Sequence, residues 1–398
     1  MPQAGSHRNH GVQRVLSFGV YSKRPEYPRH LNLLAGLRER GVEVLECHET
    51  LAERFGQRLQ TVTGAGGALR FGAGLLLTYP RLARRFPRRD AVDAVLVGYP
   101  GIFHVHLARL LRDRFQPGAA LVLDVFAPLY DTLVHDRRLL SETGLPARLL
   151  RFWERRACGA PDALVIDTAT HANHLASTCR LPREKIFPVW VGPTFPPARD
   201  PVVAATARND LRVVFVGTYI PLHGIEVILD AARRLRGVAE VRFALVVGSG
   251  QLGKRLEARC REWDLGNVRL REWVDAGELR DLYRNHDIGL GIFGDTEKAS
   301  RVIPIKVFDL CAAGLPVITS DTPAIREAFR QGENACLVPP ADPEALARAI
   351  LKLRDQPQLR TALAQGAYRT GGEDFSERRI GEQALQAIRA GRSTRASR

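Results

Sequence analysis

Lys306 and Asp309 place a cation and a carboxylate three residues apart, on one face of a helix expected over residues 304–313. Gly314 can end this helix in a left-handed conformation, and Pro316 prevents its continuation before the next strand. A buried lysine at a helix start can bind a diphosphate, and an aspartate one turn later can accept hydrogen bonds from sugar hydroxyls. The same spacing is also common in exposed ion pairs, which contribute about 0.3 to 0.5 kcal/mol. Spacing alone leaves both interpretations open.

Lysine is rare in this chain, since only six of the 58 basic residues are lysines and three of the six lie between positions 254 and 306. Where arginine supplies most of the charge, a lysine indicates a need for a compact point charge rather than a planar fork. This supports Lys306 as a phosphate ligand. Lys298 is instead expected to be a solvated residue of an exposed loop over residues 293–300.

A second candidate anion site is the turn over residues 217–224, where an expected strand ends at Gly217 and an expected helix begins after Gly224. The side chains of Thr218 and His223 can donate hydrogen bonds to phosphate oxygens. His223 adds positive charge only when it is protonated, and a nearby diphosphate favours that form. A structural role for His223, as a cap of the following helix, is the alternative.

The glycine-rich loop over residues 248–253 follows an expected strand and opens a helix, as in dinucleotide-binding Rossmann folds. The loop lies in the middle of the second half rather than after its first strand, which disfavours an oxidoreductase. We expect the backbone at Gly248 and Gly250 and the helix N-terminus to support a nucleotide diphosphate. Lys254 is then a candidate phosphate partner, or else a solvated lysine in the first helical turn.

The elements that must position these groups are alternating strands and helices. Near-continuous apolar runs, typical of parallel strands buried on both faces, occur in both halves of the chain. In the first half, strands are expected over residues 14–20, 42–47, 94–100 and 120–126. In the second half, strands are expected over residues 211–217, 242–250, 268–272, 287–293 and 315–321, and helices over 226–236, 253–263, 277–286 and 304–313.

This α/β pattern predicts two doubly wound, Rossmann-like domains whose parallel sheets face an interdomain cleft, with ligands at the carboxyl ends of the strands. A length of 398 residues also suits two domains. A proline-rich linker separates the halves. The boundaries are expected at residues 1–192 for the N-terminal domain, 193–210 for the linker, 211–372 for the C-terminal domain, and 373–398 for a helix that packs back on the N-terminal domain. The basic end over residues 389–398 is expected to be a disordered tail.

The segment "IPIKVFDLCAAGLPVITSDTPAIREAF" resembles the donor-site motif of the retaining glycosyltransferases of family 4, which have the GT-B fold. The resemblance extends upstream over "VVFVGTYIPLHGIEVILDAARRL" and weakens toward the N-terminus. It implies that Asp309 stands where family members carry a glutamate that grips the nucleotide ribose. Arg301 stands where they carry another glutamate that contacts the transferred sugar, and Glu297 is a candidate substitute for it. Ile303 and Pro304 are assigned to the donor site on the same motif.

The resemblance implies transfer of a sugar from a nucleotide-diphosphate donor. Leaving-group stabilisation is the main requirement of such a reaction, and preorganised cations can supply it. We therefore assign His223, Arg301 and Lys306 to the departing diphosphate and Asp309 to the ribose. The sequence has no clear Asp-x-Asp motif near an apolar strand end, so we expect neither a metal requirement nor a cofactor beyond the sugar nucleotide.

The N-terminal half offers fewer candidates. Asp124, which follows the strand expected over residues 120–126, is assigned to catalysis on the acceptor side, with a buried helix cap as its alternative role. Tyr99 and Asp131 are acceptor-side candidates near it. The segment "DVFAPLYDTLVHDR" also resembles a bacterial branch of family 4. His104 and His106 are expected to be helix residues rather than metal ligands.

Composition points to a globular, cytoplasmic protein. Hydrophobic residues make up 45% and charged residues 25% of the chain, and the six cysteines show no spacing typical of zinc or redox sites. Neither a leader sequence nor a run of eighteen apolar residues is evident. We expect a cytoplasmic location, with the inner face of the plasma membrane as a further option.

The net charge of +15 is distributed unevenly, because residues 54–89 contain eight arginines and no acidic residue. Leu82 and Phe86 lie at helical spacing among these arginines. Such a segment can lie on an anionic bilayer, with each nearby cation contributing about 1 kcal/mol, or it can be a solvated helix face. A nucleic-acid partner is disfavoured, since no aromatic platform or binding motif accompanies the charge. The residues assigned to peripheral membrane contact are Arg81, Arg84, Arg85, Arg88 and Arg89.

The favoured function is therefore transfer of a sugar from a nucleotide donor to a glycan or lipid-linked acceptor in cell-surface polysaccharide or glycolipid synthesis. Two alternatives stay open. The replaced glutamate at Arg301 suits an inactive sugar-nucleotide-binding scaffold of a membrane-associated polysaccharide complex. A nucleotide-sugar epimerase shares the two-domain architecture.

Overall fold

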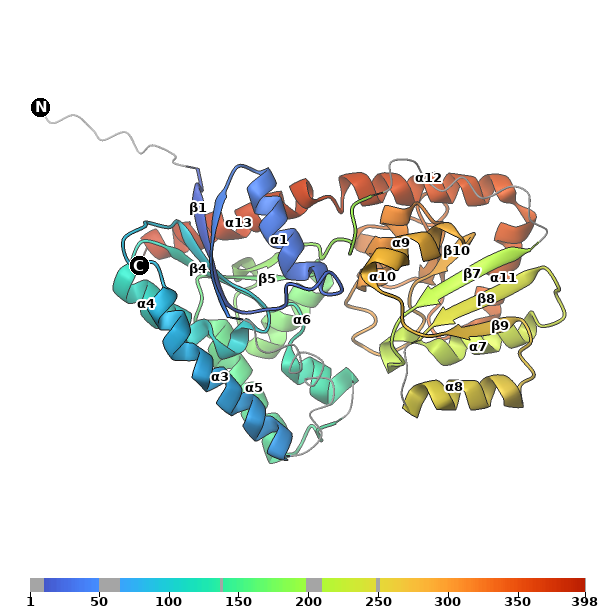
Figure 1. The fold of residues 1–398 in the computed structure, drawn as a ribbon, viewed down its shortest axis with the longest axis horizontal. Helices are drawn as coiled ribbons and strands as arrows, with labels where there is room; N and C mark the ends of the chain where they lie inside the picture. The colour runs from blue at the N-terminus through green and yellow to red at the C-terminus, as the bar shows by residue number, and fades with distance from the viewer. Residues whose placement is uncertain (1–10, 50–64, 137–138, 198–209, 248–250, 398) are drawn as a thin grey trace, which may run out of the picture.

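The structure, a computed structural model, describes residues 11–49, 65–136, 139–197, 210–247 and 251–397, which form two α/β domains (Figure 1). Each domain holds a six-stranded sheet in which every strand pair is parallel. Strand residues are mostly buried on both faces, as the apolar runs predict. The prediction of two Rossmann-like domains is confirmed.

The N-terminal sheet has the strand order β2-β1-β3-β4-β5-β6. Its strands are β1 (Arg14–Val20), β2 (Glu43–Glu49), β3 (Ala94–Val97), β4 (Ala120–Asp124), β5 (Ala163–Ile166) and β6 (Ile186–Pro188). The helices are α1 (Pro28–Glu39), α3 (Ala65–Arg85), α4 (Val105–Phe115), α5 (Leu145–Gly159) and α6 (Ala169–Cys179), with a π-helical turn η2 over Asp131–Asp136.

The C-terminal sheet has the strand order β12-β11-β10-β7-β8-β9. Its strands are β7 (Leu211–Val216), β8 (Val241–Val246), β9 (Val268–Arg271), β10 (Ile288–Leu290), β11 (Val317–Ser320) and β12 (Cys336–Val338). The helices are α7 (Ile225–Arg234), α8 (Gln251–Glu262), α9 (Ala276–Arg284), α10 (Ile305–Ala313), α11 (Pro343–Asp355) and α12 (Pro357–Glu373). The order reverses between β7 and β10, which makes their carboxyl ends the topological switch point where ligands of open α/β sheets bind.

The last helix, α13 (Glu377–Ala396), leaves the C-terminal domain and packs on the N-terminal domain, against α1 and β4 (Figure 1). The two helices cross at Gly36 and Gly381, where a Cβ on either residue would collide with the backbone of the other. This close approach requires glycine at both positions, because any side chain would push the helices apart.

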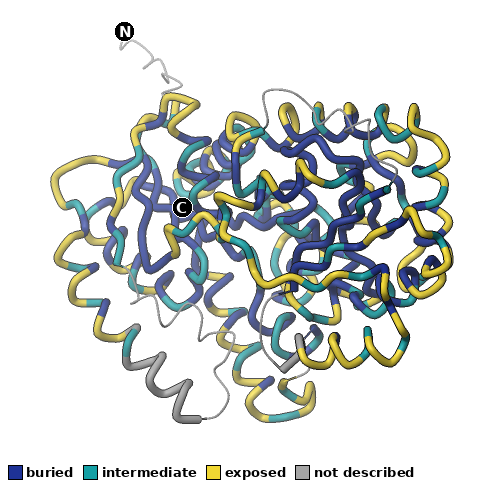
Figure 2. Tube along the Cα trace, turned by 45° about the vertical axis from the view of Figure 1, so that its right-hand side comes forward, coloured by how far each residue is buried: buried dark blue, intermediate teal, exposed yellow. Residues whose placement is uncertain are grey.

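The expectation of a disordered tail over residues 389–398 is wrong for the residues that the structure describes. Helix α13 continues to Ala396. Arg392 pairs with Asp93 at 3.1 Å, and Arg395 pairs with Asp113 at 3.1 Å. The basic residues of this end therefore bind the N-terminal domain, which explains why the segment is ordered. Figure 2 shows the buried segments inside the two domains and the exposed ones on the outer helices and loops.

Candidate functional site

The candidate site lies at the switch point of the C-terminal sheet, where the turn after β7 faces the start of α10. Gly217 follows β7, and the turn over Pro221–His223 leads to Gly224, which takes the left-handed conformation at φ 63°. A Cβ at Gly224 would collide with the backbone at Phe293 and Gly294, so glycine permits the turn to pack against the segment after β10. Pro304 precedes α10, and Gly314 ends it at φ 72°, as predicted for its left-handed cap.

Lys306 lies in the first turn of α10 and is 7% exposed. Its ammonium Nζ is buried with no hydrogen-bond partner and sits 3.9 Å from the centre of the Phe215 ring. Burial lowers the pKa of Lys306 well below its usual value, because the charged form loses hydration. The interpretation of Lys306 and Asp309 as an exposed ion pair is wrong, since both side chains are buried. A buried ammonium without a partner is the arrangement expected of a group that receives an anionic ligand.

The side chains of His223 and Lys306 both approach Gly217. A Cβ at Gly217 would collide with Lys306 Nζ and would lie 3.1 Å from both Nδ1 and Cε1 of His223. Because the Thr218 carbonyl can only accept a hydrogen bond, the His223 Nδ1 beside it carries the proton and Nε2 is left as an acceptor. Burial and then the charge of Lys306 lower the pKa of His223 well below its usual value. Both effects favour the neutral form of His223, whereas a bound diphosphate would favour its protonation.

Asp309 lies one turn after Lys306 and points to the segment between the domains. Its carboxylate accepts hydrogen bonds from the Thr194 backbone N–H at 2.6 Å and from the Thr194 hydroxyl at 3.1 Å. Burial raises the pKa of Asp309 to about 7, although the bonds from Thr194 oppose the shift. The site thus holds one buried ammonium without a partner and one buried carboxyl that is satisfied by the linker.

Arg301 turns away to the N-terminal domain. Its guanidinium donates from Nη2 to Asp131 Oδ1 at 2.7 Å and from Nη1 to Glu297 at 3.2 Å. Burial raises the pKa of Asp131, but the charges of Arg301 and Lys298 outweigh this effect and the pKa is lowered. Of the three cations assigned to the diphosphate, Lys306 and His223 lie close together. Arg301 instead forms an ion pair with Asp131 that bridges the two domains.

Further bonds join the carboxyl ends of the two sheets. The Thr168 hydroxyl, which follows β5, donates to the Arg301 carbonyl. Glu327 accepts from the backbone N–H groups of Ala169 and Thr170, both at 2.7 Å, and so caps helix α6 from the opposite domain. Residues after β5 therefore face residues after β10 and β11, which is the arrangement that the predicted interdomain site requires.

Comparisons with known proteins agree with this architecture. Residues 210–356 match the family described as glycosyl transferases group 1. Sucrose-phosphate synthase from Thermosynechococcus elongatus superposes with a TM-score of 0.66 at 16% identity, over 95% of this chain and 98% of that one. HepE of Anabaena, solved with UDP-glucose, superposes with a TM-score of 0.66 at 14% identity, over 94% of this chain and 99% of that one. The chain has the GT-B fold, and residues 210–356 are similar to the group 1 glycosyltransferases.

Two sequence relatives are also sugar transferases by name. A D-inositol 3-phosphate glycosyltransferase from Thermobispora bispora is 29% identical over 58% of this chain and 56% of its own length. A phosphatidyl-myo-inositol mannosyltransferase from Mycobacterium leprae is 29% identical over 57% of this chain and 54% of its own length. The alignments therefore span about half the length of these relatives.

The remaining donor-side candidates of this GT-B chain lie around the same turn or on the surface. Thr218 is exposed beside Gly217, and Ile303 and Pro304 precede α10, with Ile303 buried. Lys254 is exposed in the first turn of α8, and Glu297 is exposed apart from its pairing with Arg301. Gly248 and Gly250 lie outside the described residues.

The acceptor-side candidates Asp124, Tyr99 and Asp131 have different surroundings. Asp124 ends β4 fully buried, and its carboxylate accepts from Arg29 Nη2 at 3.0 Å and Nε at 3.1 Å. Burial raises the pKa of Asp124, and the Arg29 charge opposes the shift. Asp124 is thus half of a buried ion pair rather than a helix cap. Tyr99 follows β3, and its ring meets Phe126 edge-on at 5.5 Å.

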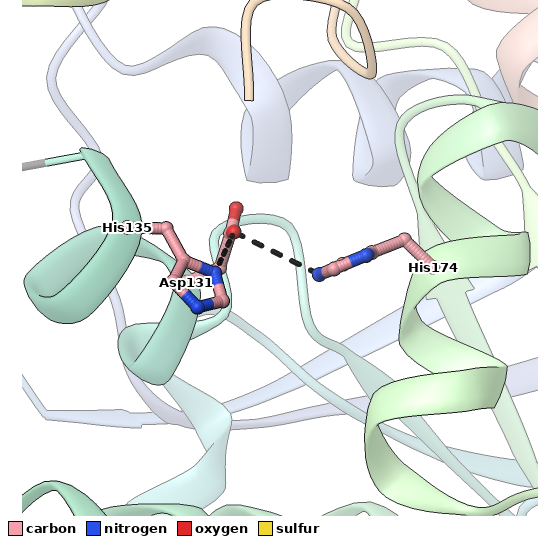
Figure 3. Close-up of side chains that lie close together, drawn as sticks. All are labelled: Asp131, His135 and His174. Carbon is pink, nitrogen blue, oxygen red and sulfur yellow. Dashed lines mark hydrogen bonds and ion pairs between the residues drawn. The ribbon is translucent and has the colours of Figure 1, made fainter. Parts of the chain in front are cut away.

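Asp131 pairs with Arg301 and also lies close to two histidines, His135 and His174, which Figure 3 shows. His135 Nδ1 lies 3.3 Å from Asp131 Oδ1, and His174 Nε2 lies 3.7 Å from the same oxygen. Burial and then the Arg301 charge lower the pKa of His174 to about 4. Sequence reasoning missed both histidines, although the four-residue spacing of Asp131 and His135 was a readable signal.

Lys298 is also not the solvated loop residue that was expected. It is 8% exposed, and its Nζ donates to the Thr132 hydroxyl at 2.9 Å. The interdomain contact explains the burial, which the local sequence does not reveal. Arg29 and Thr194, the partners of Asp124 and Asp309, were also not among the residues predicted from the sequence.

A basic hollow of about 500 Å³ lies elsewhere in the C-terminal domain and is lined in part by Arg212, Arg242 and Arg269. Arg212 and Arg242 sit near the amino ends of β7 and β8, whereas Gly217 follows the carboxyl end of β7. Ligands of doubly wound sheets bind at the carboxyl ends. The hollow is therefore not the site built around Lys306.

Proposed function

We propose that this protein is a retaining glycosyltransferase, which moves a sugar from a nucleotide-diphosphate donor to a glycan or lipid-linked acceptor in cell-surface polysaccharide or glycolipid synthesis. The observation that carries the proposal is the buried Lys306 ammonium, which has no hydrogen-bond partner and lies against Gly217 and His223 at the switch point. A diphosphate placed there would neutralise the charge and satisfy the donor. The family assignment of residues 210–356 supports the same reading.

The chemistry follows from charge that develops on the leaving diphosphate. As the sugar–oxygen bond breaks, negative charge grows on the diphosphate, and a fixed ammonium in a water-poor site stabilises that charge more than it stabilises the bound donor. His223, once protonated beside the diphosphate, would add a donor from Nε2. We propose that these groups act without a metal. Asp309 would contact the ribose after exchanging its bonds from Thr194 for bonds from the ribose hydroxyls.

Arg301 and Asp131 have a positioning role in this proposal. Their 2.7 Å bridge holds the acceptor-side domain against the donor-side domain. Solved neighbours of the same fold bind UDP or UDP-glucose, as with HepE, or UDP and GlcNAc, as with the pneumococcal transferase GtfA. UDP-sugars are therefore the first donors to test. Relatives include a D-inositol 3-phosphate glycosyltransferase, a phosphatidyl-myo-inositol mannosyltransferase and a lipopolysaccharide core biosynthesis glycosyltransferase, so inositol phosphates and lipid-linked glycans are the first acceptors to test.

The decisive experiment combines ligand binding with turnover. UDP, GDP, ADP and their sugars are screened by thermal shift, since a ligand at 100 times its Kd stabilises by about 2.7 kcal/mol. Turnover of the best donor is then measured in wild type and Lys306→Ala. We expect a loss of roughly 100-fold or more in Lys306→Ala. Lys352→Ala, which removes an exposed lysine of α11, is the control and should leave turnover unchanged.

Three other outcomes would contradict the proposed mechanism or the proposed function. A folded Lys306→Ala variant with normal turnover would remove Lys306 from the mechanism. Donor binding without hydrolysis or transfer over a panel of acceptors would indicate the inactive scaffold. Isomerisation of the donor without any acceptor would indicate an epimerase.

We also propose peripheral contact with an anionic membrane at the cytoplasmic face, and helix α5 supplies its strongest support. Leu145, Leu149, Phe152 and Trp153 follow one another at helical spacing and are 42% to 65% exposed. Arginines lie among them, including the exposed Arg148. An exposed apolar stripe with cationic flanks is typical of helices that lie in a membrane interface.

The contribution of α3 differs from the sequence-based expectation. Leu82 and Phe86 are buried in the domain core, so the apolar face expected to meet a bilayer points inward. Leu76 and Leu77 are exposed instead, at 64% and 71%. The arginines assigned to membrane contact are exposed, although Arg81 and Arg85 also pair with Glu49; they are Arg81, Arg84, Arg85, Arg88 and Arg89.

Vesicle sedimentation tests this contact. Wild type should bind vesicles that contain anionic lipid, and Phe152→Ser should weaken binding by about tenfold, since burying a phenyl side chain contributes about 1.5 to 3 kcal/mol. Trp273→Ser, which removes an exposed aromatic residue of the C-terminal domain, is the matched control. Equal binding of the two variants would exclude α5 as the contact. Among the described residues, no helix is long and apolar enough to cross a bilayer.

A further inference from the structure

Three side chains of the N-terminal domain converge at its edge with the C-terminal domain. Asp131 and His135 lie one turn apart in η2, and His174 projects toward them from α6 (Figure 3). One ligand atom from each residue lies within 4.8 Å of the others. π-Helical turns such as η2 are frequent at functional sites.

The separations match those of a metal-binding site. In tetrahedral coordination at the Zn–N and Zn–O distances of proteins, neighbouring ligand atoms are about 3.3 Å apart. His135 Nδ1 and His174 Nε2 lie 3.3 Å and 3.7 Å from Asp131 Oδ1. Two imidazoles and a carboxylate form a donor set that zinc and its neighbours in the transition series prefer.

One oxygen of Asp131 has no hydrogen-bond partner, and a carboxylate lies near His135. Asp131 is 2% exposed, yet its Oδ2 has no hydrogen-bond partner. Glu142 Oε1 lies 3.9 Å from His135 Nε2, the nitrogen opposite the proposed ligand atom. The Glu142 carboxylate lies beyond hydrogen-bond distance, and it adds negative charge beside the histidine that would bind the cation. The histidine side chains are 27% and 23% exposed, so an ion can reach them from solvent.

One contact opposes a cation at this position. Arg301 donates to Asp131 Oδ1 at 2.7 Å, the oxygen that the two histidines face. A divalent ion and a guanidinium on one oxygen would repel each other strongly. Arg301 has a second acceptor in Glu297, at 3.2 Å, which would remain available after it left Asp131.

We propose that Asp131, His135 and His174 form a binding site for a divalent transition-metal ion of the zinc class, which competes with Arg301 for Asp131. All three ligands belong to the N-terminal domain, whereas Arg301 belongs to the C-terminal domain. Metal binding therefore releases one of the bonds that join the domains. The site shares no residue with the proposed diphosphate site, and metal binding acts on the interface that Arg301 and Asp131 hold together rather than supplying a cofactor to the reaction.

Isothermal titration of untagged, full-length protein with Zn²⁺, and visible absorption with Co²⁺, test the site. Wild type should bind one equivalent that His135→Ala and His174→Ala each weaken by at least tenfold. The His135→Ala, His174→Ala double variant keeps nine of the eleven histidines. The difference in Zn²⁺ affinity between it and wild type therefore reports this cluster alone. His286→Ala is the control, because His286 bonds to the Leu282 carbonyl in the other domain.

Arg301→Gln tests the competition. Removal of the guanidinium charge should raise the affinity for Zn²⁺ by about tenfold, which corresponds to about 1.4 kcal/mol. Circular dichroism and thermal melting establish that each variant is folded. Equal Zn²⁺ affinity of wild type and the His135→Ala, His174→Ala double variant would overturn the site. Unchanged or weaker binding by Arg301→Gln would overturn the competition.

Discussion

Lys306 and Asp124 are both buried ionisable groups near the carboxyl end of a parallel sheet, but they differ in their partners. The Asp124 carboxylate accepts two bonds from Arg29, whose Nη1 also donates to the carbonyls of Val189 and Trp190. The Lys306 ammonium has no hydrogen-bond partner. The paired carboxylate is satisfied by the fold itself, whereas the unpaired ammonium is satisfied only when a ligand arrives.

The difference has an energetic consequence. Removal of one member of a buried ion pair costs about 3 to 5 kcal/mol, because it leaves the other charge without compensation. Removal of a buried charge that has no partner relieves a desolvation penalty instead. Stability measurements can therefore separate structural charges from functional ones at this interface.

The largest expected effect is the loss of Arg29. Arg29→Met keeps most of the side-chain volume but leaves Asp124 buried alone, so we expect the free energy of unfolding to fall by about 3 to 5 kcal/mol. Lys306→Met should leave the free energy of unfolding unchanged or higher while weakening nucleotide binding. Urea unfolding of both variants measures the contrast. Equal destabilisation would mean that Lys306 also has a structural partner.

Asp309 gives the next largest effect, and it appears in the pH dependence of stability. Burial raises its pKa from 3.8 to about 7. Between these values the folded protein binds a proton that the unfolded protein has lost, so stability falls as pH rises through this window. Asp309→Asn removes this dependence. Relative to wild type, we expect the variant to gain about 3 kcal/mol between pH 5 and pH 8.

Urea unfolding at the two pH values provides the measurement. Asp355→Asn is a suitable control, because Asp355 is exposed on α11 and its pKa is lowered from 3.8, so it does not titrate in this range. A constant difference between wild type and Asp309→Asn would show that Asp309 is ionised in the folded protein. In that case the bonds from Thr194 would outweigh burial.

The comparison also shows what local sequence can reveal. The strands and the helix of Lys306 follow from apolar runs and from caps such as Gly314, and Lys306 meets His223 across the short turn that spacing identified. These features depend on residues close in sequence or on the regular geometry of a doubly wound sheet. They could be predicted because each local preference agrees with the fold.

Apart from the contact of Asp131 with His135, the missed contacts join distant residues. Arg29 and Asp124 are 95 residues apart, Thr194 and Asp309 are 115 apart, and Arg301 and Asp131 are 170 apart. Such pairs depend on how two domains and a returning helix pack, which no periodicity records. The packing of the two domains also buries Lys298, although the sequence of its loop is typical of an exposed turn.

Gly217→Ala is expected to have the smallest of these effects. It should weaken nucleotide binding and leave the stability of the fold nearly unchanged. The new Cβ would collide with Lys306 Nζ and lie 3.1 Å from His223 Nδ1. Nζ is the end of a flexible side chain, so it can move aside at little cost to folding, but it then leaves the position proposed for the diphosphate. We expect about a tenfold weaker Kd for the nucleotide found in the thermal screen, equivalent to about 1.4 kcal/mol.

Gly277→Ala is the matched control, because Gly277 lies in α9 and a Cβ there would meet no atom within 4 Å. Alanine also has a higher helix propensity than glycine, so this control should be slightly more stable than wild type and bind the nucleotide equally well. Calorimetric titration of both variants compares them directly. If Gly217→Ala binds as tightly as Gly277→Ala, the diphosphate does not approach Gly217, and the unpaired ammonium of Lys306 must serve a different ligand.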